Sequence, residues 1–148
     1  MTALSGRIVD GEHRYPLRIF YEDTDAGGIV YHARYLNFAE RARTEVLRLA
    51  GIQQTELQAS YGVVFALRSC KVDFRRPARL DDLVEVRSRF TAMKGAKLTA
   101  AQTIWRANEE LTRIDVEVAS VRDDGRPIRI PETVRAALEP YLQSMEQG

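Results

Sequence analysis

Cysteine, histidine and lysine are all scarce in this sequence. The 148 residues include one cysteine, Cys70, and two histidines. An intramolecular disulfide is therefore excluded, and so is a zinc site of the usual Cys/His kind. Only three of the 22 basic residues are lysines, namely Lys71, Lys94 and Lys97. The others are arginines, which favour forked contacts with carboxylate or phosphate groups.

Long apolar runs and a strong net charge are also absent. Apolar stretches extend over only a few residues, whereas a membrane-spanning helix needs roughly 18–20. Asp10, Glu12 and Arg14 lie where a signal peptide would need an apolar run. The formal net charge of +1 argues against a broad nucleic-acid surface. We expect a cytoplasmic protein with no membrane span and no nucleic-acid partner.

The composition is that of an ordinary globular domain, at 45% hydrophobic and 29% charged residues. A chain of this length buries roughly 68–70% of its unfolded surface, so it can form a core without disulfides or metal. No internal repeat, low-complexity tract or linker interrupts the sequence. We expect a single domain over residues 1–148, with a core from about residue 14 to residue 135.

Apolar periodicity predicts one long helix over residues 33–50 and a short helix near residues 53–60. The long helix ends at Gly51, and its apolar residues recur every three or four positions: Tyr35, Phe38, Ala39, Ala42, Val46 and Leu49. A terminal helix over about residues 131–145 opens with Pro131. We expect Pro140 to interrupt it.

Alternation of apolar and polar residues predicts strands in most of the remaining chain. A short strand pattern runs from Leu17 to Tyr21, and three later strands near residues 84–90, 99–105 and 114–118 should form an antiparallel meander. A long strand ends before Pro77, with one apolar face made of Val64, Ala66, Cys70, Val72 and Phe74. We therefore expect Cys70 to be a packed apolar thiol.

This order of elements predicts an α+β fold, with an antiparallel sheet curled around one long helix. One helix covers only part of a sheet face, so apolar surface or a strand edge remains for a second copy of the chain. We expect a homodimer on this ground.

The segment Tyr21-Glu-Asp-Thr-Asp-Ala-Gly-Gly-Ile-Val-Tyr-His32 places three carboxylates and two glycines before the long helix. A helix N-terminus presents unpaired N–H groups that can stabilise an oxyanion. Asp25 could then act as a nucleophile or as a general base on water, and Gly28 would let a ligand approach the backbone closely. Equally, Asp25 could only close a turn, and His32 could only complete the first turn of the helix.

Two other kinds of site fit this segment poorly. A calcium loop beginning at Asp23 would need glutamate at its twelfth position, which is Arg34 here. A phosphate-binding Walker motif is absent. Elsewhere, Lys94 and Lys97 lie at a predicted hairpin, where they could meet ligand phosphates or simply be solvated. The basic run beginning at Arg75 is followed by Asp81 and Asp82, which favours a solvated loop.

Three segments together resemble the Tol-Pal-associated, YbgC-type acyl-CoA thioesterases of the 4-hydroxybenzoyl-CoA thioesterase superfamily. They are residues 21–32, Phe38-Ala-Glu-Arg-Ala-Arg-Thr-Glu45 and Arg76-Pro-Ala-Arg-Leu-Asp-Asp82. The resemblance spans about Leu17 to Pro131. It implies a hot-dog fold, and dimers or tetramers with active sites at subunit interfaces.

The resemblance also implies roles for individual residues. Asp25 matches the catalytic carboxylate, and the backbone N–H of His32 would face the thioester carbonyl. Gly28 and Tyr31 would lie beside the substrate, and Lys94, with Lys97 nearby, would meet the phosphates of CoA. No metal or cofactor is implied.

The implied activity is hydrolysis of an acyl thioester to free acid and CoA. Two alternatives remain: a hydratase or dehydratase on the same fold, and a non-catalytic module of a cell-envelope system. That module would bind acyl-CoA or an acyl carrier protein.

Overall fold

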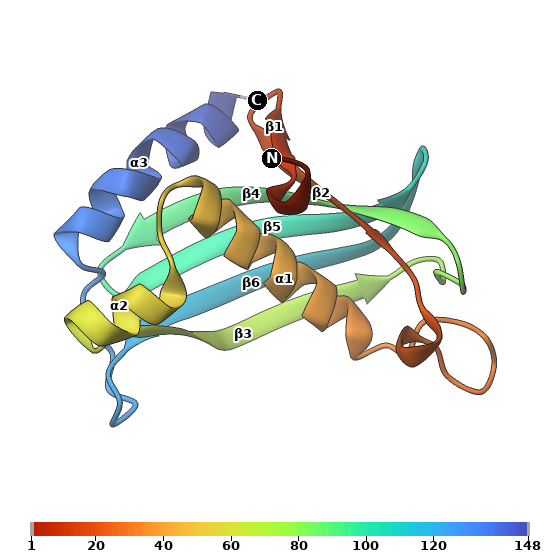
Figure 1. Cartoon of the computed structure of the whole chain (residues 1–148), viewed down its shortest axis with the longest axis horizontal. Helices are drawn as coiled ribbons and strands as arrows, with labels where there is room; N and C mark the ends of the chain where they lie inside the picture. Colours follow the sequence, from red (N-terminus) through yellow and green to blue (C-terminus); the bar gives the residue numbers. More distant parts are fainter. Residues whose placement is uncertain (1, 148) are drawn as a thin grey trace.

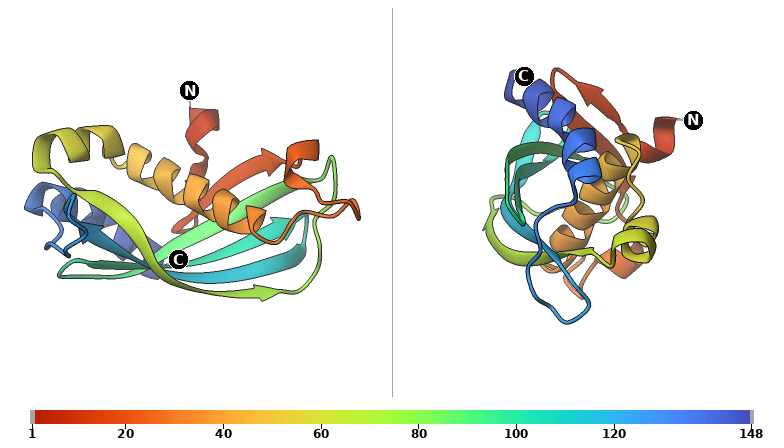
Figure 2. Two further views of the ribbon diagram at one scale, coloured as in Figure 1. Left: turned by 90° about the horizontal axis from the view of Figure 1, so that it is seen from below. Right: turned by 90° about the vertical axis from the view of Figure 1, so that its left-hand side faces the viewer.

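A computed structural model describes the backbone of residues 2–147 and the side chains of residues 4–142. Six antiparallel strands form one curved sheet, and the long helix α1 (Arg34–Leu49) lies across its concave face (Figures 1 and 2). The strand order is β1-β2-β4-β5-β6-β3. The strand bounds are Arg7–Val9, Glu12–Arg18, Val64–Phe74, Leu83–Lys94, Lys97–Arg106 and Glu109–Val121 for β1 to β6.

The predicted helical stripe packs α1 against the sheet. Its buried side chains face the inward residues of the strands, which alternate with polar residues on the outer face. The buried residues of α1 are Tyr35, Phe38, Ala39, Ala42, Val46 and Leu47. The long helix, the short helix α2 (Gln54–Tyr61) and the β4–β5–β6 meander confirm the predicted α+β fold. Among the described residues, no helix is long and apolar enough to cross a membrane.

The first predicted strand was misplaced. β2 covers Glu12–Arg18, and Tyr21 instead begins the 3₁₀ helix η2 (Tyr21–Asp23), where its side chain is 80% exposed. The turn forms because the carboxylate of Asp23 accepts a hydrogen bond from the N–H of Phe20 at 2.9 Å. β1 and the 3₁₀ helix η1 (Thr2–Ser5), which precede β2, were not predicted.

The prediction for Cys70 was wrong, because its thiol is exposed in the single chain. A register shift between Leu67 and Ser69 inserts one extra residue into β3, so the alternation changes phase there. Val64 and Ala66 therefore point away from the face that carries Cys70. β3 is also the edge strand of the sheet (Figure 1).

The terminal helix α3 (Glu132–Gln147) continues through Pro140, contrary to the predicted interruption. A proline removes one backbone hydrogen bond from a helix interior. Packing on both sides of it compensates: Leu138 is buried, and the hydroxyl of Tyr141 donates to the carbonyl oxygen of Leu49 at 2.9 Å. Tertiary contacts thus hold α3 across the proline.

Candidate active site

The segment before α1, residues 19–31, folds into a tight loop that we call the active-site loop. The N–H of Asp25 donates to the carbonyl oxygen of Ile29 at 2.9 Å, and the N–H of Gly28 donates back to the carbonyl oxygen of Asp25 at 3.0 Å. Thr24 and Val30 form an isolated antiparallel bridge just outside this turn. Asp25 therefore occupies a defined position at the start of a miniature hairpin.

The carboxylate of Asp25 is exposed and makes one hydrogen bond. Its Oδ1 accepts the N–H of Gly27 at 2.9 Å, which is the turn-closing contact that the sequence allowed. Its Oδ2 has no hydrogen-bond partner among the described residues. Gly28 has a φ of +81°, a left-handed conformation that favours glycine. Closing the turn thus leaves one carboxylate oxygen available for chemistry.

The amino end of α1 presents two unpaired donors. Arg34 donates its N–H to the carbonyl oxygen of Tyr31 at 2.8 Å, and the helix has no side-chain N-cap. The N–H groups of His32 and Ala33 have no acceptor within the described part of the chain. The positive end of the helix dipole adds to their attraction for a negatively charged oxygen.

The active-site loop carries three of the predicted site residues, Asp25, Gly28 and Tyr31, and the fourth, His32, follows it directly. The N–H of Tyr31 donates to the carbonyl oxygen of Asp23 at 2.9 Å, so the residues before and after the turn at Asp25 are hydrogen-bonded to each other. The rings of Tyr31 and His32 are in contact, with centroids 4.4 Å apart. One short segment therefore carries both the carboxylate and the helix donors.

An open pocket of about 270 Å³ lies beside the start of α1. Three aromatic rings form much of its wall: Phe74 meets His32 and Tyr35 edge-on, with centroid separations of 6.5 Å and 5.5 Å. The residues that line the pocket are Ile29, Val30, His32, Tyr35, Phe74, Arg75, Arg76 and Pro77. Its apolar wall and cationic rim suit an apolar group attached to an anionic carrier.

Sequence reasoning missed Tyr35 and Phe74 as parts of the site. The hydroxyl of Tyr35 accepts the N–H of Ala78 at 2.9 Å, and burial raises the pKa of Tyr35 above its usual value. This bond ties the first turn of α1 to the segment after β3. The only sequence signal was a polar tip at a buried helix position, which does not reveal its partner.

The two predicted lysines, Lys94 and Lys97, lie far from Asp25 within one chain. Lys94 ends β4 and Lys97 begins β5, and this hairpin is at the far end of the sheet from the loop that precedes α1 (Figure 1). Lys97 is 3.5 Å from a carboxylate oxygen of Glu117. Within one chain the structure therefore does not bring either lysine to Asp25.

The described residues contain no group of three or more His, Cys, Asp or Glu side chains that could hold a metal ion.

Comparison with known proteins identifies the family of this chain. The sequence profile of the family described as the Thioesterase superfamily matches residues 27–113. The chain belongs to the thioesterase superfamily. Acyl-CoA thioesterase YbgC from Haemophilus influenzae is 41% identical to this thioesterase over 132 residues, covering 88% of this chain and 96% of the relative.

Two further relatives extend the comparison. Acyl-CoA thioester hydrolase YbgC from Escherichia coli O6:H1 is 43% identical to this thioesterase over 126 residues, covering 83% of this chain and 92% of the relative. The crystal structure of a probable thioesterase from Bartonella henselae superposes with a TM-score of 0.78 at 36% identity, covering 81% of this chain and 99% of that one. The expected superfamily and the hot-dog fold are both confirmed.

Proposed function

We propose that this thioesterase hydrolyses acyl-CoA with Asp25 as its catalytic carboxylate and the amino end of α1 as its oxyanion site. The observation that carries the proposal is that one short segment contains a carboxylate oxygen of Asp25 and N–H groups of His32 and Ala33 that have no partners among the described residues. The curated relatives named above are an acyl-CoA thioesterase and an acyl-CoA thioester hydrolase. Their substrate class fits this pair of groups.

In this mechanism the N–H groups at His32 and Ala33 hydrogen-bond to the thioester carbonyl oxygen and stabilise the negative charge that develops on it. Asp25 either removes a proton from an attacking water or attacks the carbonyl carbon itself, forming an anhydride that water then hydrolyses. The C–S bond breaks, and the electron pair leaves with the sulfur as CoA thiolate. A thiolate leaves readily, so no strong general acid is needed.

Gly28 and Tyr31 are proposed to lie beside the thioester. An added Cβ on Gly28 would meet no atom within 4 Å, so the backbone there is open to a ligand. The ring of Tyr31 is 48% exposed next to His32, where it can cover the pantetheine or acyl arm. Both positions border the polarised carbonyl.

We also propose that the working unit is a homodimer formed along the free edge of β3. This edge strand has 11 residues and, in the described part of the chain, pairs with β6 alone; Leu67 is 47% and Phe74 50% exposed. An edge of this length with apolar side chains pairs readily with another strand. A tetramer would require a second contact surface between such dimers.

Three finer proposals remain. An acyl carrier protein is an alternative carrier, and an association with the Tol-Pal system rests on the sequence resemblance. A cytoplasmic location rests on the lack of a signal-peptide pattern and of long apolar runs in the sequence. The same chemistry serves either carrier, since the phosphopantetheine thioester is common to both. The nucleotide of CoA is what distinguishes them.

Thiol release from short, medium, long and aromatic acyl-CoAs, followed with a chromogenic thiol reagent, tests the hydrolysis. Asp25→Asn should reduce kcat by roughly 100-fold or more, because the amide neither attacks nor accepts the proton of water. Asp123→Asn, an exposed aspartate in the segment after β6, is the matched control and should keep full activity. Equal activity of the Asp25 variant would refute the assignment. Tight acyl-CoA binding without turnover by the wild type would favour a binding module.

A further inference from the structure

The loop between β3 and β4, residues 75–82, pairs directly with the active-site loop; we call it the β3–β4 loop. The N–H of Val30 donates to the carbonyl oxygen of Ala78 at 2.9 Å, and Ile29 forms an isolated antiparallel bridge with Arg79. The carbonyl oxygen of Ile29 in turn accepts the N–H of Asp25 at 2.9 Å. The position of Asp25 is therefore two backbone contacts away from Ala78 and Arg79.

The β3–β4 loop also holds the beginning of the active-site loop. The N–H of Ile19 donates to the carbonyl oxygen of Asp82 at 2.9 Å, and the N–H of Asp81 donates to the carbonyl oxygen of Ile19 at 3.0 Å. A guanidinium N–H of Arg18 donates to the carbonyl oxygen of Asp81 at 2.9 Å. The active-site loop is thus held at both ends by the same eight-residue segment.

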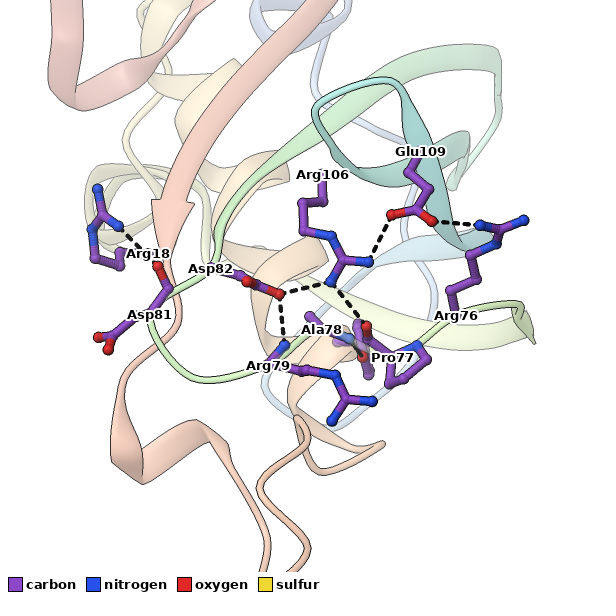
Figure 3. Close-up of polar contacts among 10 residues, drawn as sticks. Arg18, Arg76, Pro77, Ala78, Arg79, Asp81, Asp82, Arg106 and Glu109 are labelled. Atoms are coloured by element: carbon purple, nitrogen blue, oxygen red, sulfur yellow. Dashed lines mark hydrogen bonds and ion pairs between the residues drawn. The ribbon is translucent and has the colours of Figure 1, made fainter.

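One side chain fastens the β3–β4 loop to the sheet. Arg106, the last residue of β5, donates through Nη1 to Oδ2 of Asp82 at 2.7 Å and to the carbonyl oxygen of Pro77 at 3.2 Å (Figure 3). The same Oδ2 accepts the N–H of Arg79 at 2.8 Å. Through Nη2, Arg106 donates to Oε1 of Glu109 at 2.7 Å. The guanidinium therefore spans the loop near both of its ends.

Charged neighbours hold the guanidinium group of Arg106 in place. Glu109 is bonded on its other oxygen by Arg76, and the hydrogen bonds from Arg106 and Arg76 hold the pKa of Glu109 below its usual value. The bonds to Glu109 and Asp82 raise the pKa of Arg106. Arg106 and Glu109 are thus both ionised near neutral pH. Arg106 is 30% and Asp82 23% exposed, so their attraction is less screened than that of a fully solvated pair.

We propose that Arg106 is a positioning residue for the catalytic carboxylate, acting through the β3–β4 loop. Its guanidinium group bonds Asp82 and Pro77 and so fixes the two sides of this loop. The residues between them, Ala78 and Arg79, pair with Val30 and Ile29. This pairing sets where Asp25 lies relative to the amino end of α1. The proposal rests on the proposed function of Asp25. Arg106 itself does not line the pocket, and it bonds the lining residue Pro77 at the backbone carbonyl, so it should affect turnover more than binding.

The test compares kinetics with local opening in Arg106→Ala and in the near-isosteric Asp82→Asn. We expect kcat to fall roughly tenfold in Arg106→Ala while KM changes less than about twofold, since small misplacements of a catalytic group are costly. Asp82→Asn should lower kcat by a smaller factor, and Arg106→Lys should retain part of the activity because one of the two carboxylate contacts survives. Amide hydrogen exchange in residues 24–31, read by mass spectrometry, should accelerate in the alanine variant.

Arg87→Ala is the matched control. Arg87 is also a strand arginine, 22% exposed, bonded to Glu85 at 2.8 Å and stacked on Trp105, and both partners lie on β4 and β5. Its removal should leave kcat and the exchange of residues 24–31 unchanged.

Three results would overturn the proposal: unchanged kcat in Arg106→Ala, unchanged exchange in residues 24–31, or an equal fall of kcat in Arg87→Ala. If Arg106→Ala does not fold, Asp82→Asn decides by the same criteria. If the wild type hydrolyses no acyl-CoA, the proposed hydrolysis fails, and the exchange comparison alone decides on the positioning role.

Discussion

The ring of His32 lies edge-on to the ring of Phe74, with 6.5 Å between their centroids and 81° between their planes. His32 precedes α1, whereas Phe74 ends the edge strand β3. The contact therefore joins the proposed oxyanion site to a strand that comes about forty residues later in the chain. It also closes one wall of the aromatic pocket.

Replacing Phe74 should weaken substrate binding. Phe74→Ala removes an aromatic wall that is half-exposed in the single chain, at a cost of about 1 kcal/mol of apolar contact with the acyl group. We expect KM for the preferred acyl-CoA to rise roughly fivefold, with a smaller change in kcat. Steady-state thiol release measures both constants. Leu83→Ala, which is similarly exposed on β4, should leave KM unchanged; a KM effect as large there would remove Phe74 from the pocket.

The free edge of β3 gives a prediction about assembly. Leu67→Lys places a charge on this edge, which natural sheets use to prevent pairing. We expect the variant to be a monomer when size-exclusion chromatography is combined with light scattering, while the wild type is a dimer. Leu83→Lys, an equally exposed leucine on an interior strand, should remain dimeric. A monomeric wild type, or a dimeric Leu67 variant, would contradict pairing along β3.

Individual helices and strands of this fold could be predicted because each has a regular pattern of apolar residues. The stripe beginning at Tyr35 identified α1, and strict alternation identified β4 and β6. The register of β3 could not be predicted. The extra residue between Leu67 and Ser69 reverses which face of the sheet the following side chains occupy, and the sequence pattern gives no sign of it. The placement of Val64 and Ala66 on the face opposite to Cys70 became visible only in the sheet.

The site shows the same division. Asp25 and His32 lie only seven positions apart in the sequence, so a local motif was sufficient to identify both as candidates. The contacts of Tyr35 with Ala78 and of Arg106 with Asp82 join residues 43 and 24 positions apart. Such contacts depend on how the sheet packs against α1, and the hydrophobic periodicity of single segments does not predict this packing. The charge-compensated run at 75–82 was expected to be only solvated, and its pairing with Arg106 was not foreseen.

Lys94 can meet CoA only if a second copy brings its hairpin to the site, since the hairpin lies at the far end of its own sheet (Figure 1). Lys94→Ala should then raise KM for acyl-CoA about threefold and leave kcat nearly unchanged, because a phosphate contact acts on ground state and transition state alike. The matched substrate is the corresponding acyl-pantetheine, which lacks the nucleotide phosphates and should show no change. An unchanged KM for acyl-CoA would remove Lys94 from the site.

Stability should fall in mild acid because of His13. This residue on β2 is fully buried; its Nε2 donates to the carbonyl oxygen of Ser5 at 2.7 Å, while Nδ1 has no partner among the described residues. Burial lowers the pKa of His13 below its usual 6.5, an effect that the Ser5 bond and the charge of Glu45 on α1 only partly offset. Protonation of Nδ1 would bury a charged N–H group with no hydrogen-bond acceptor among the described residues, which is unfavourable.

The sign follows from proton binding. With a lowered pKa in the folded protein, the unfolded chain binds more protons, so the stability contribution of neutral His13 is complete above about pH 6.5 and is lost as the pH falls toward the folded value. Urea unfolding at pH 8 and pH 5.5 should therefore show a larger loss of unfolding free energy in the wild type than in His13→Gln, whose amide does not titrate. The variant His32→Gln, at the exposed histidine, serves as the control and should retain the wild-type loss. An identical pH dependence in wild type and His13→Gln would show that protonation of this buried ring does not destabilise the fold.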